Sequence, residues 1–287
     1  MRRLCGPDGR RKSVSLTLQY LGVAGWHFQT GQAGLLIDPY VTRLSVWQVL
    51  FGRAVPDRAL IRTHTPPAGW ILVTHPHYDH IMDVPEVARL TGAPVYASSQ
   101  GCQLLGVLGL PASQVHAVWP GDRLTLGDFK VEVCASRHRI IFGRIPYQGP
   151  LRPGLRPPLR ASDYRIDRQF SFLVQAGGLR VLVASGIDEE PSVEADLLLV
   201  GADATREQLA AILKGVRPRL VMPNHWDDMF RPLSAPVVPM RKPPRRLSLP
   251  LKRIDLEGFA RLVRELAPGA EVIVPERFRP YRLGDLL

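Results

Sequence analysis

Four side chains that can bind a metal ion lie within six consecutive positions, at His75, His77, Asp79 and His80. Neutral imidazole and carboxylate are the ligands that zinc and non-haem iron or manganese take in proteins. His75 and His77 are two residues apart, so in an extended chain both side chains can point to the same side. After the following turn, Asp79 and His80 can face a second point. We therefore predict that this single loop serves two metal ions.

The residues before this loop predict where it lies in the fold. Residues 71–74 are apolar or β-branched and run directly into His75 and Pro76, which is typical of a buried strand that ends abruptly. In α/β sheets the carboxyl ends of the strands usually present the ligand-binding groups. Asp38 ends an earlier apolar stretch at residues 34–37, and its carboxylate is a candidate acceptor for the second ring N–H of a metal-binding histidine.

The His-x-His-x-Asp-His pattern of residues 75–80 resembles the signature of the metallo-β-lactamase superfamily. Residues 16–22 and 34–39 are similar to the first hairpin of that family with its Leu-Ile-Asp-Pro ending, and the likeness extends over roughly residues 14–230. The resemblance implies an α/β fold, a four-layer αββα sandwich with two sheets face to face. The branches most similar in motif are the ascorbate-phosphate lactonases and the N-acyl-phosphatidylethanolamine phospholipase D enzymes, although these usually carry Gly-His where this chain has Gly22-Val23.

The resemblance also implies a complete set of metal ligands. Matched onto this chain, the first ion takes His75, His77 and His138, the second takes Asp79, His80 and His225, and Asp188 bridges the two. His138 and His225 each follow a predicted strand, as His75 does. Asp188 departs from the Gly-Asp-Thr ending of the family, because Ile187 separates it from the glycine and Glu189 replaces the threonine.

Hydrolysis by a hydroxide that bridges two divalent metal ions is the reaction that the resemblance implies, with Asp79 as proton acceptor. The ligand set favours zinc, with manganese or iron as alternatives. Because zinc lowers the pKa of bound water to about 7, no side-chain nucleophile is needed, and no Gly-x-Ser-x-Gly sequence occurs. The expected substrates contain an ester, lactone, amide or phosphodiester bond.

The chain is strongly basic, with a formal net charge of +11 carried mainly by arginine. This charge indicates either an anionic partner or only the codon usage of a GC-rich genome. Arginine and proline gather at residues 139–168 and 231–253. The first segment leaves directly from a predicted ligand, so it is either a lid over the site or a solvated loop. Since arginine suits phosphate and carboxylate, we expect a small-molecule or lipid-like anionic substrate, contacted by Arg137, Arg139 and Trp226.

Two other functions remain open. The basic segments could bind nucleic acid, as a binding protein or a nuclease, although they lack interleaved aromatic residues for base stacking. The same fold could also carry an iron-dependent redox site. The completeness of the second predicted ligand set argues against the redox alternative.

One large domain accounts for the chain, with residues 1–13 as a basic tail and residues 14–287 as a single domain that carries the two basic insertions. An apolar run at residues 44–51 predicts a helix that packs into the core, and less strongly a flap that faces lipid or substrate. Cys5, Cys102 and Cys134 are odd in number and widely spaced, which suits the reducing cytoplasm. No stretch approaches the roughly 20 apolar residues of a membrane span, and no feature determines the oligomeric state.

Overall fold

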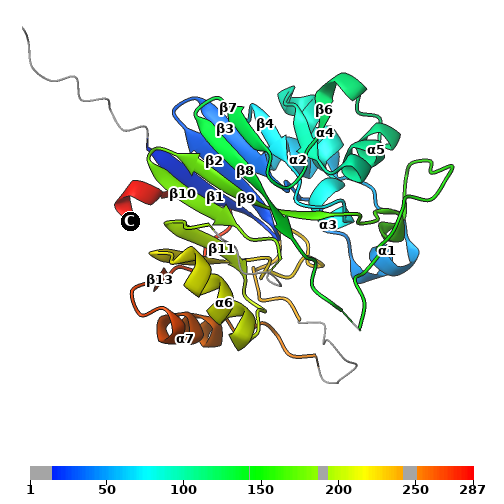
Figure 1. Ribbon diagram of the computed structural model, residues 1–287. Helices are drawn as coiled ribbons and strands as arrows, with labels where there is room; N and C mark the ends of the chain where they lie inside the picture. Colours follow the sequence, from blue (N-terminus) through cyan, green and yellow to red (C-terminus); the bar gives the residue numbers. More distant parts are fainter. Residues whose placement is uncertain (1–14, 142, 187–192, 242–250) are drawn as a thin grey trace, which may run out of the picture.

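Two mixed β-sheets face each other at the centre of the structure, with helices on their outer sides (Figure 1). The structure, a computed structural model, describes residues 15–141, 143–186, 193–241 and 251–287. The first sheet has the order β14 (Pro280–Arg282), β1 (Leu16–Gly22), β2 (Gly25–Thr30), β3 (Ala33–Ile37), β4 (Trp70–Leu72), β5 (Val95–Ala97) and β6 (Val115–Ala117). The second has the order β13 (Glu271–Val272), β12 (Leu220–Asn224), β11 (Leu197–Gly201), β10 (Leu179–Val183), β9 (Gln169–Ala176), β8 (Phe129–Ser136) and β7 (Arg123–Leu126).

The helices lie outside the two sheets, and those of the first and second halves of the chain lie in different places. Those of the first half are α1 (Val46–Phe51), α2 (Arg58–His64), α3 (Tyr78–Ile81), α4 (Val84–Thr91) and α5 (Ser99–Val107). α6 (Arg206–Val216) and α7 (Leu256–Leu266) pack together beside the second sheet, on the opposite side from α4 and α5 (Figure 1). The α/β sandwich that the sequence predicted is confirmed. No helix of the described residues has both the length and the apolar character needed to cross a membrane.

Strands covered on both faces form the core between the layers. Residues 197–200 of β11 are all apolar and fully buried, as expected for a parallel strand between a sheet and a helix layer. β11 pairs in parallel with both β10 and β12. The carboxyl ends of these strands therefore lie at the same edge, and β12 delivers the segment that begins with His225 to that edge.

The first hairpin differs from the prediction. The likeness of residues 16–22 and 34–39 to a single hairpin predicts two strands, whereas three strands occupy residues 16–37. The additional turn lies at Val23 and Ala24, where Val23 has a φ of 54°. A β-branched residue rarely takes this conformation, so Val23 itself does not indicate a turn, although Gly22 and Gly25 flank it.

Residues 46–51 of the apolar run form a helix, but the prediction that this helix packs into the core is wrong, and only Leu44 before it is buried there. α1 buries none of its residues, and 72% of Trp47 and 68% of Phe51 are exposed. The helix begins at Ser45, whose hydroxyl accepts from the N–H of Gln48 while the Gln48 side chain accepts from the N–H of Ser45. This capping box stabilises a short helix without burial of its apolar side chains.

Two further segments are tied to the core. Asp83 precedes α4, but its side chain does not cap the helix; it accepts instead from the N–H groups of Val41 and Thr42, both at 2.8 Å. The basic segment at residues 139–168 is not simply solvated, because Leu159 and Tyr164 are buried in the core. Residues 1–13, predicted as a basic tail, lie outside the described part of the chain.

Candidate metal centre

The loop after β4 carries the first group of candidate ligands, and a buried carboxylate holds it in place. Val73 continues the pairing with β5 through a bond from its N–H to Tyr96 O, and Pro76 then ends the extended conformation. The N–H of Thr74 donates to Asp38 Oδ1 at 2.7 Å, and the Thr74 hydroxyl donates to Oδ2 of the same carboxylate. Because Asp38 follows the adjacent parallel strand β3, the loop is fixed to the end of the first sheet.

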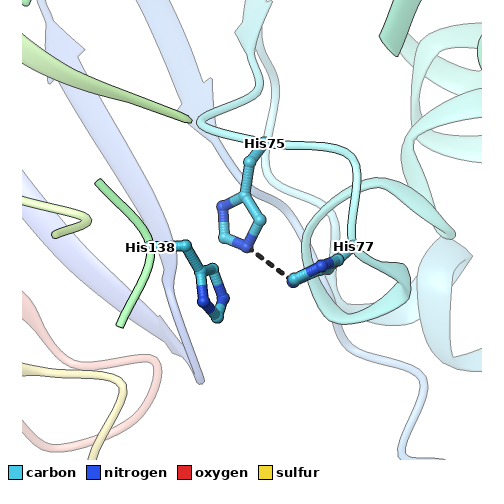
Figure 2. Close-up of side chains that lie close together, drawn as sticks. All are labelled: His75, His77 and His138. Carbon is cyan, nitrogen blue, oxygen red and sulfur yellow. Dashed lines mark hydrogen bonds between the residues drawn. The ribbon is translucent and has the colours of Figure 1, made fainter. Parts of the chain in front are cut away.

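Three histidine rings converge on one point (Figure 2). His75 and His77 come from the loop after β4, and His138 comes from the segment after β8 in the other sheet. One ring nitrogen of each lies within 4.8 Å of the others. His75 Nε2 and His77 Nδ1 are 3.1 Å apart, close to the roughly 3.3 Å between two nitrogens on a tetrahedral zinc ion.

Burial keeps these rings uncharged. It lowers the pKa of His77 to about 3 and that of His138 to about 4, and it holds the pKa of His75 well below its ordinary value. The neighbouring histidines lower the pKa of each ring further. A neutral imidazole offers a lone pair, which is the form that a metal ion requires.

Hydrogen bonds determine which nitrogen of each ring carries that lone pair. Four histidines each place one ring nitrogen on a protein oxygen: His75 Nδ1 on the Thr74 hydroxyl (3.1 Å), His77 Nε2 on Pro146 O (3.0 Å), His80 Nδ1 on Asp38 Oδ2 (2.7 Å) and His138 Nδ1 on Arg139 O (2.8 Å). With these nitrogens as N–H donors, the second nitrogen of every ring is an acceptor. Acceptor nitrogens that face one another at 3.1 Å repel unless a cation lies between them, so the donor set fits a metal ion.

A second group combines Asp79, His80 and His225. Asp79 Oδ2 lies 3.1 Å from His225 Nε2 and 3.6 Å from His80 Nε2. Burial alone would raise the pKa of Asp79, but His80 and His225 outweigh it and lower this pKa below its ordinary value. Burial likewise opposes the charged form of His80, yet Asp38 and Asp79 raise its pKa. The group is therefore a buried carboxylate between two imidazoles, a donor set that also suits a divalent cation.

His225 is held by a network that the sequence analysis missed. The residue follows β12 with a φ of 50°, and its N–H donates to Val23 O at 2.8 Å. Asp227 Oδ1 accepts from the N–H of Val23 at 2.6 Å and from the hydroxyl of Tyr20 at 2.7 Å, and Oδ2 accepts from Arg43 Nη2 at 3.2 Å. The turn between β1 and β2 thus positions His225 at the second group.

Both groups lie on one cavity of about 760 Å³. The cavity is also lined by α1, by Pro146 and Tyr147 of the first basic segment, and by residues after β12. It is large enough for a drug-sized ligand. The two sets of candidate ligands therefore face a common space in which a substrate could lie.

Comparison with known proteins identifies the family. A model of the beta-lactamase superfamily domain matches residues 34–226, two thirds of the chain. The chain belongs to the metallo-β-lactamase superfamily. The resemblance seen in the sequence is thereby confirmed.

Similar proteins include relatives in sequence and solved structures with a similar fold. A UPF0173 metal-dependent hydrolase from Symbiobacterium thermophilum is 26% identical over 273 residues, which cover 90% of this chain and 96% of the relative. Igni18, a metallo hydrolase from Ignicoccus hospitalis, is 20% identical with a TM-score of 0.59, over 93% of this chain and 97% of that one. CmlA, a diiron β-hydroxylase from Streptomyces venezuelae, is 15% identical with a TM-score of 0.55, over 94% of this chain and 54% of that one.

The predicted bridging ligand and the three residues predicted to contact substrate do not all lie at the main cavity of this superfamily member. Asp188, the predicted bridge, lies outside the described residues. Arg139 lines the cavity and pairs with Asp203, whereas Arg137 is exposed and lines a separate cavity of about 380 Å³. Trp226, predicted to contact substrate, is only 6% exposed and is not among the residues that line the main cavity. Its ring stacks on a core aromatic ring, at 6.2 Å between centroids.

Proposed function

We propose that the protein is a dinuclear metal-dependent hydrolase, with zinc as the favoured metal. In this proposal His75, His77 and His138 bind one cation, and Asp79, His80 and His225 bind the other, with Asp188 as the bridging ligand. The observation that carries the proposal is that two largely buried donor sets from three separate segments face a single cavity. Bound divalent cations would supply Lewis-acid polarisation of the scissile group and a water molecule of lowered pKa.

The side chains around the two sites hold the ligands in place. Asp38 accepts from His80 Nδ1, which directs Nε2 toward the second site. Pro146 O accepts from His77 Nε2, which directs the Nδ1 of that ring toward the first site. Asp79 remains ionised because its pKa is lowered, so it is in the form that a metal ligand requires; its role as proton acceptor is proposed from the family resemblance alone. Groups fixed in this way reduce the reorganisation that metal binding and catalysis require.

The substrate that we propose contains an ester, lactone, amide or phosphodiester bond and carries negative charge. Arg139 and Arg241 line the cavity and support the anionic assignment, since guanidinium groups bind carboxylate and phosphate. Asp203, the partner of Arg139, also lines the cavity. The basic character of the cavity therefore depends on Arg241 and on the bound cations more than on Arg139.

Metal analysis and a substrate panel test the proposal together. Protein purified with zinc or manganese should contain about two metal ions per chain, since each donor set suits one ion, and should hydrolyse at least one class among lactones, carboxylic esters and phosphodiesters. His77→Ala and His138→Ala should each lose metal and activity. His116→Ala is the matched control, because this exposed histidine stacks on Tyr96 outside the cavity. Full turnover by metal-free protein would refute the proposal.

An iron-dependent redox function is the second candidate, because the fold is shared with the diiron β-hydroxylase CmlA and the same ligands can bind iron. Hydrolytic turnover by an iron-free preparation excludes it, whereas substrate-dependent oxygen consumption would support it. Nucleic-acid binding by the basic segments is tested by gel shift at low salt, where retention should be strong and should fall steeply as salt increases.

A further inference from the structure

One wall of the cavity is a helix with exposed apolar side chains. Val46, Val49 and Leu50 of α1 line the same cavity as both donor sets. The same helix carries Trp47 and Phe51, whose rings stack at 5.7 Å and remain largely exposed. α1 therefore presents apolar surface continuously from the inside of the cavity to its outside.

The position of this helix is fixed even though none of its residues is buried. The Ser45–Gln48 capping box defines its start, and Val49 is partly buried against the core. The next segment is anchored by the N–H of Ala54, which donates to Leu159 O at 2.7 Å. A contiguous exposed apolar surface on an ordered element marks a binding site in soluble proteins.

The remaining walls of the cavity are also largely apolar. They are formed by Met229, Phe230, Met240 and Leu251 from the region after β12, with Ile141 and Tyr147 from the first basic segment. Methionine side chains adapt to flexible apolar ligands. The polar groups are mainly the two donor sets and the charged pair Arg139–Asp203, together with Ser185, Asn224, Asp228 and Arg241. The lining thus changes from polar at the candidate metal site to apolar along α1.

We propose that the substrate is an amphiphile whose anionic group lies at the metal site and whose long alkyl chain lies along α1. This inference rests on the hydrolase function proposed above and specifies its substrate class. Continuity of the apolar surface with the site favours a substrate chain over a separate protein partner. The net charge of +11 favours an anionic amphiphile over a second copy of the chain, because like-charged copies repel each other.

The affinity for a series of n-alkyl phosphates tests this directly. Isothermal titration calorimetry is performed with butyl, hexyl, octyl, decyl and dodecyl phosphate, below their micelle concentrations, on zinc-loaded and on chelated protein. The Kd should fall about fourfold per added methylene, since each buried methylene contributes about 0.8 kcal/mol, until the chain reaches the end of the cavity. The dependence on chain length should survive chelation, because it belongs to α1 and not to the metal.

A matched pair of variants tests where the alkyl chain of the ligand lies. Leu50→Gln places a polar group in the cavity wall and should raise the Kd of decyl phosphate at least tenfold while leaving that of butyl phosphate within twofold, given the transfer cost of a leucine-sized contact. Leu90→Gln is the control, because Leu90 is similarly exposed on α4 (48% against 58%) but does not line the cavity. This control should leave every Kd unchanged.

Three results would overturn the inference. The first is a Kd that does not depend on chain length, and the second is an equal effect of the two leucine variants. The third is a dimer in sedimentation velocity that Leu50→Gln dissociates without change in decyl phosphate affinity, which would assign α1 to a second copy. Hydrolysis of short substrates with a flat chain-length series would refute the alkyl-chain assignment alone and leave the hydrolase function standing.

Discussion

Asp227 is the centre of the buried network behind His225, and its replacement gives the sharpest test of how that histidine is held. Its carboxylate pairs with Arg43, and the two side chains are only 2% and 1% exposed. Only Arg43 Nη2 reaches this carboxylate, and the buried Nε and Nη1 have no hydrogen-bond partner among the described residues. Asp227 is therefore the principal compensation for a buried guanidinium charge.

The contacts of Asp227 allow the loss in the free energy of unfolding to be estimated for two substitutions. Asp227→Ala leaves the Arg43 charge uncompensated and removes the acceptor of the Val23 N–H and the Tyr20 hydroxyl, so we expect the free energy of unfolding to fall by roughly 4–6 kcal/mol. Asp227→Asn keeps an acceptor oxygen for the Val23 N–H and the Tyr20 hydroxyl but loses the charge and the oxygen that accepts from Arg43 Nη2, so we expect a loss of about 2–3 kcal/mol. Both variants should also weaken metal binding at the group that contains His225.

Urea unfolding of metal-free protein measures the first effect, and zinc competition with a chromophoric chelator measures the second. The double variant Arg43→Met/Asp227→Asn is the control, because removal of both charges removes the desolvation penalty. It should be clearly more stable than the sum of the single effects predicts. The reasoning is refuted if Asp227→Asn costs less than about 1 kcal/mol, or if the two substitutions are additive.

Three further predictions concern the loop, the metal and pH. Asp38→Ala leaves all proposed ligands intact but removes the acceptor of His80 Nδ1, so it should lower zinc affinity by roughly 10–100-fold. Chelator competition measures this loss, and an unchanged affinity would contradict the role of that hydrogen bond. Zinc at 100 times its Kd should stabilise the protein by about 2.7 kcal/mol, which calorimetry detects as a higher Tm, and EDTA should reverse the shift; equal Tm values would argue against a preformed site. Burial raises the pKa of Asp83 to about 6 even though Val41 and Thr42 donate to it, so the folded state binds a proton that the unfolded state releases, and the contribution of Asp83 to stability should increase as pH falls from about 6 to 4. Buried histidines with lowered pKa values, such as His77 and His138, act in the opposite direction over this range, so the contribution of Asp83 is measured as the difference from Asp83→Asn. This variant should be more stable than the parent by up to about 3 kcal/mol at pH 7.5, and the difference should shrink at pH 4.5; a difference that is the same at both pH values would show that Asp83 is not buried as a charge.

The candidate site could be predicted from the sequence because its residues follow the ends of predicted strands. His75, His138 and His225 each follow an apolar stretch that a proline or a change of pattern ends, and parallel or facing strands bring such ends together. Asp38 could be predicted for the same reason. Which of these residues share a metal site was predicted from the family pattern alone. Local sequence does not contain this information, because contacts between distant segments depend on how the two sheets pack.

The sequence could not reveal features that depend on surroundings. The apolar run at residues 44–51 has the same composition whether it packs into a core or lines a cavity, so periodicity alone favoured the core. Trp226 follows a candidate ligand, yet its ring lies in the core beside Tyr20. Asp227 differs from an exposed carboxylate only through partners that are more than 180 residues away in the chain.

The edge of the first sheet has a consequence for synthesis of the protein. β1 pairs with β14 through Leu18 and Tyr281, and at roughly 5–20 residues per second the ribosome needs roughly 13–50 seconds to make the chain between them. During that interval the unpaired N–H and C=O groups of β1 form an open edge that other chains can bind. Nascent chains should therefore depend on chaperones until the C-terminal strand emerges, and a truncation before Pro280 would make this transient hazard permanent.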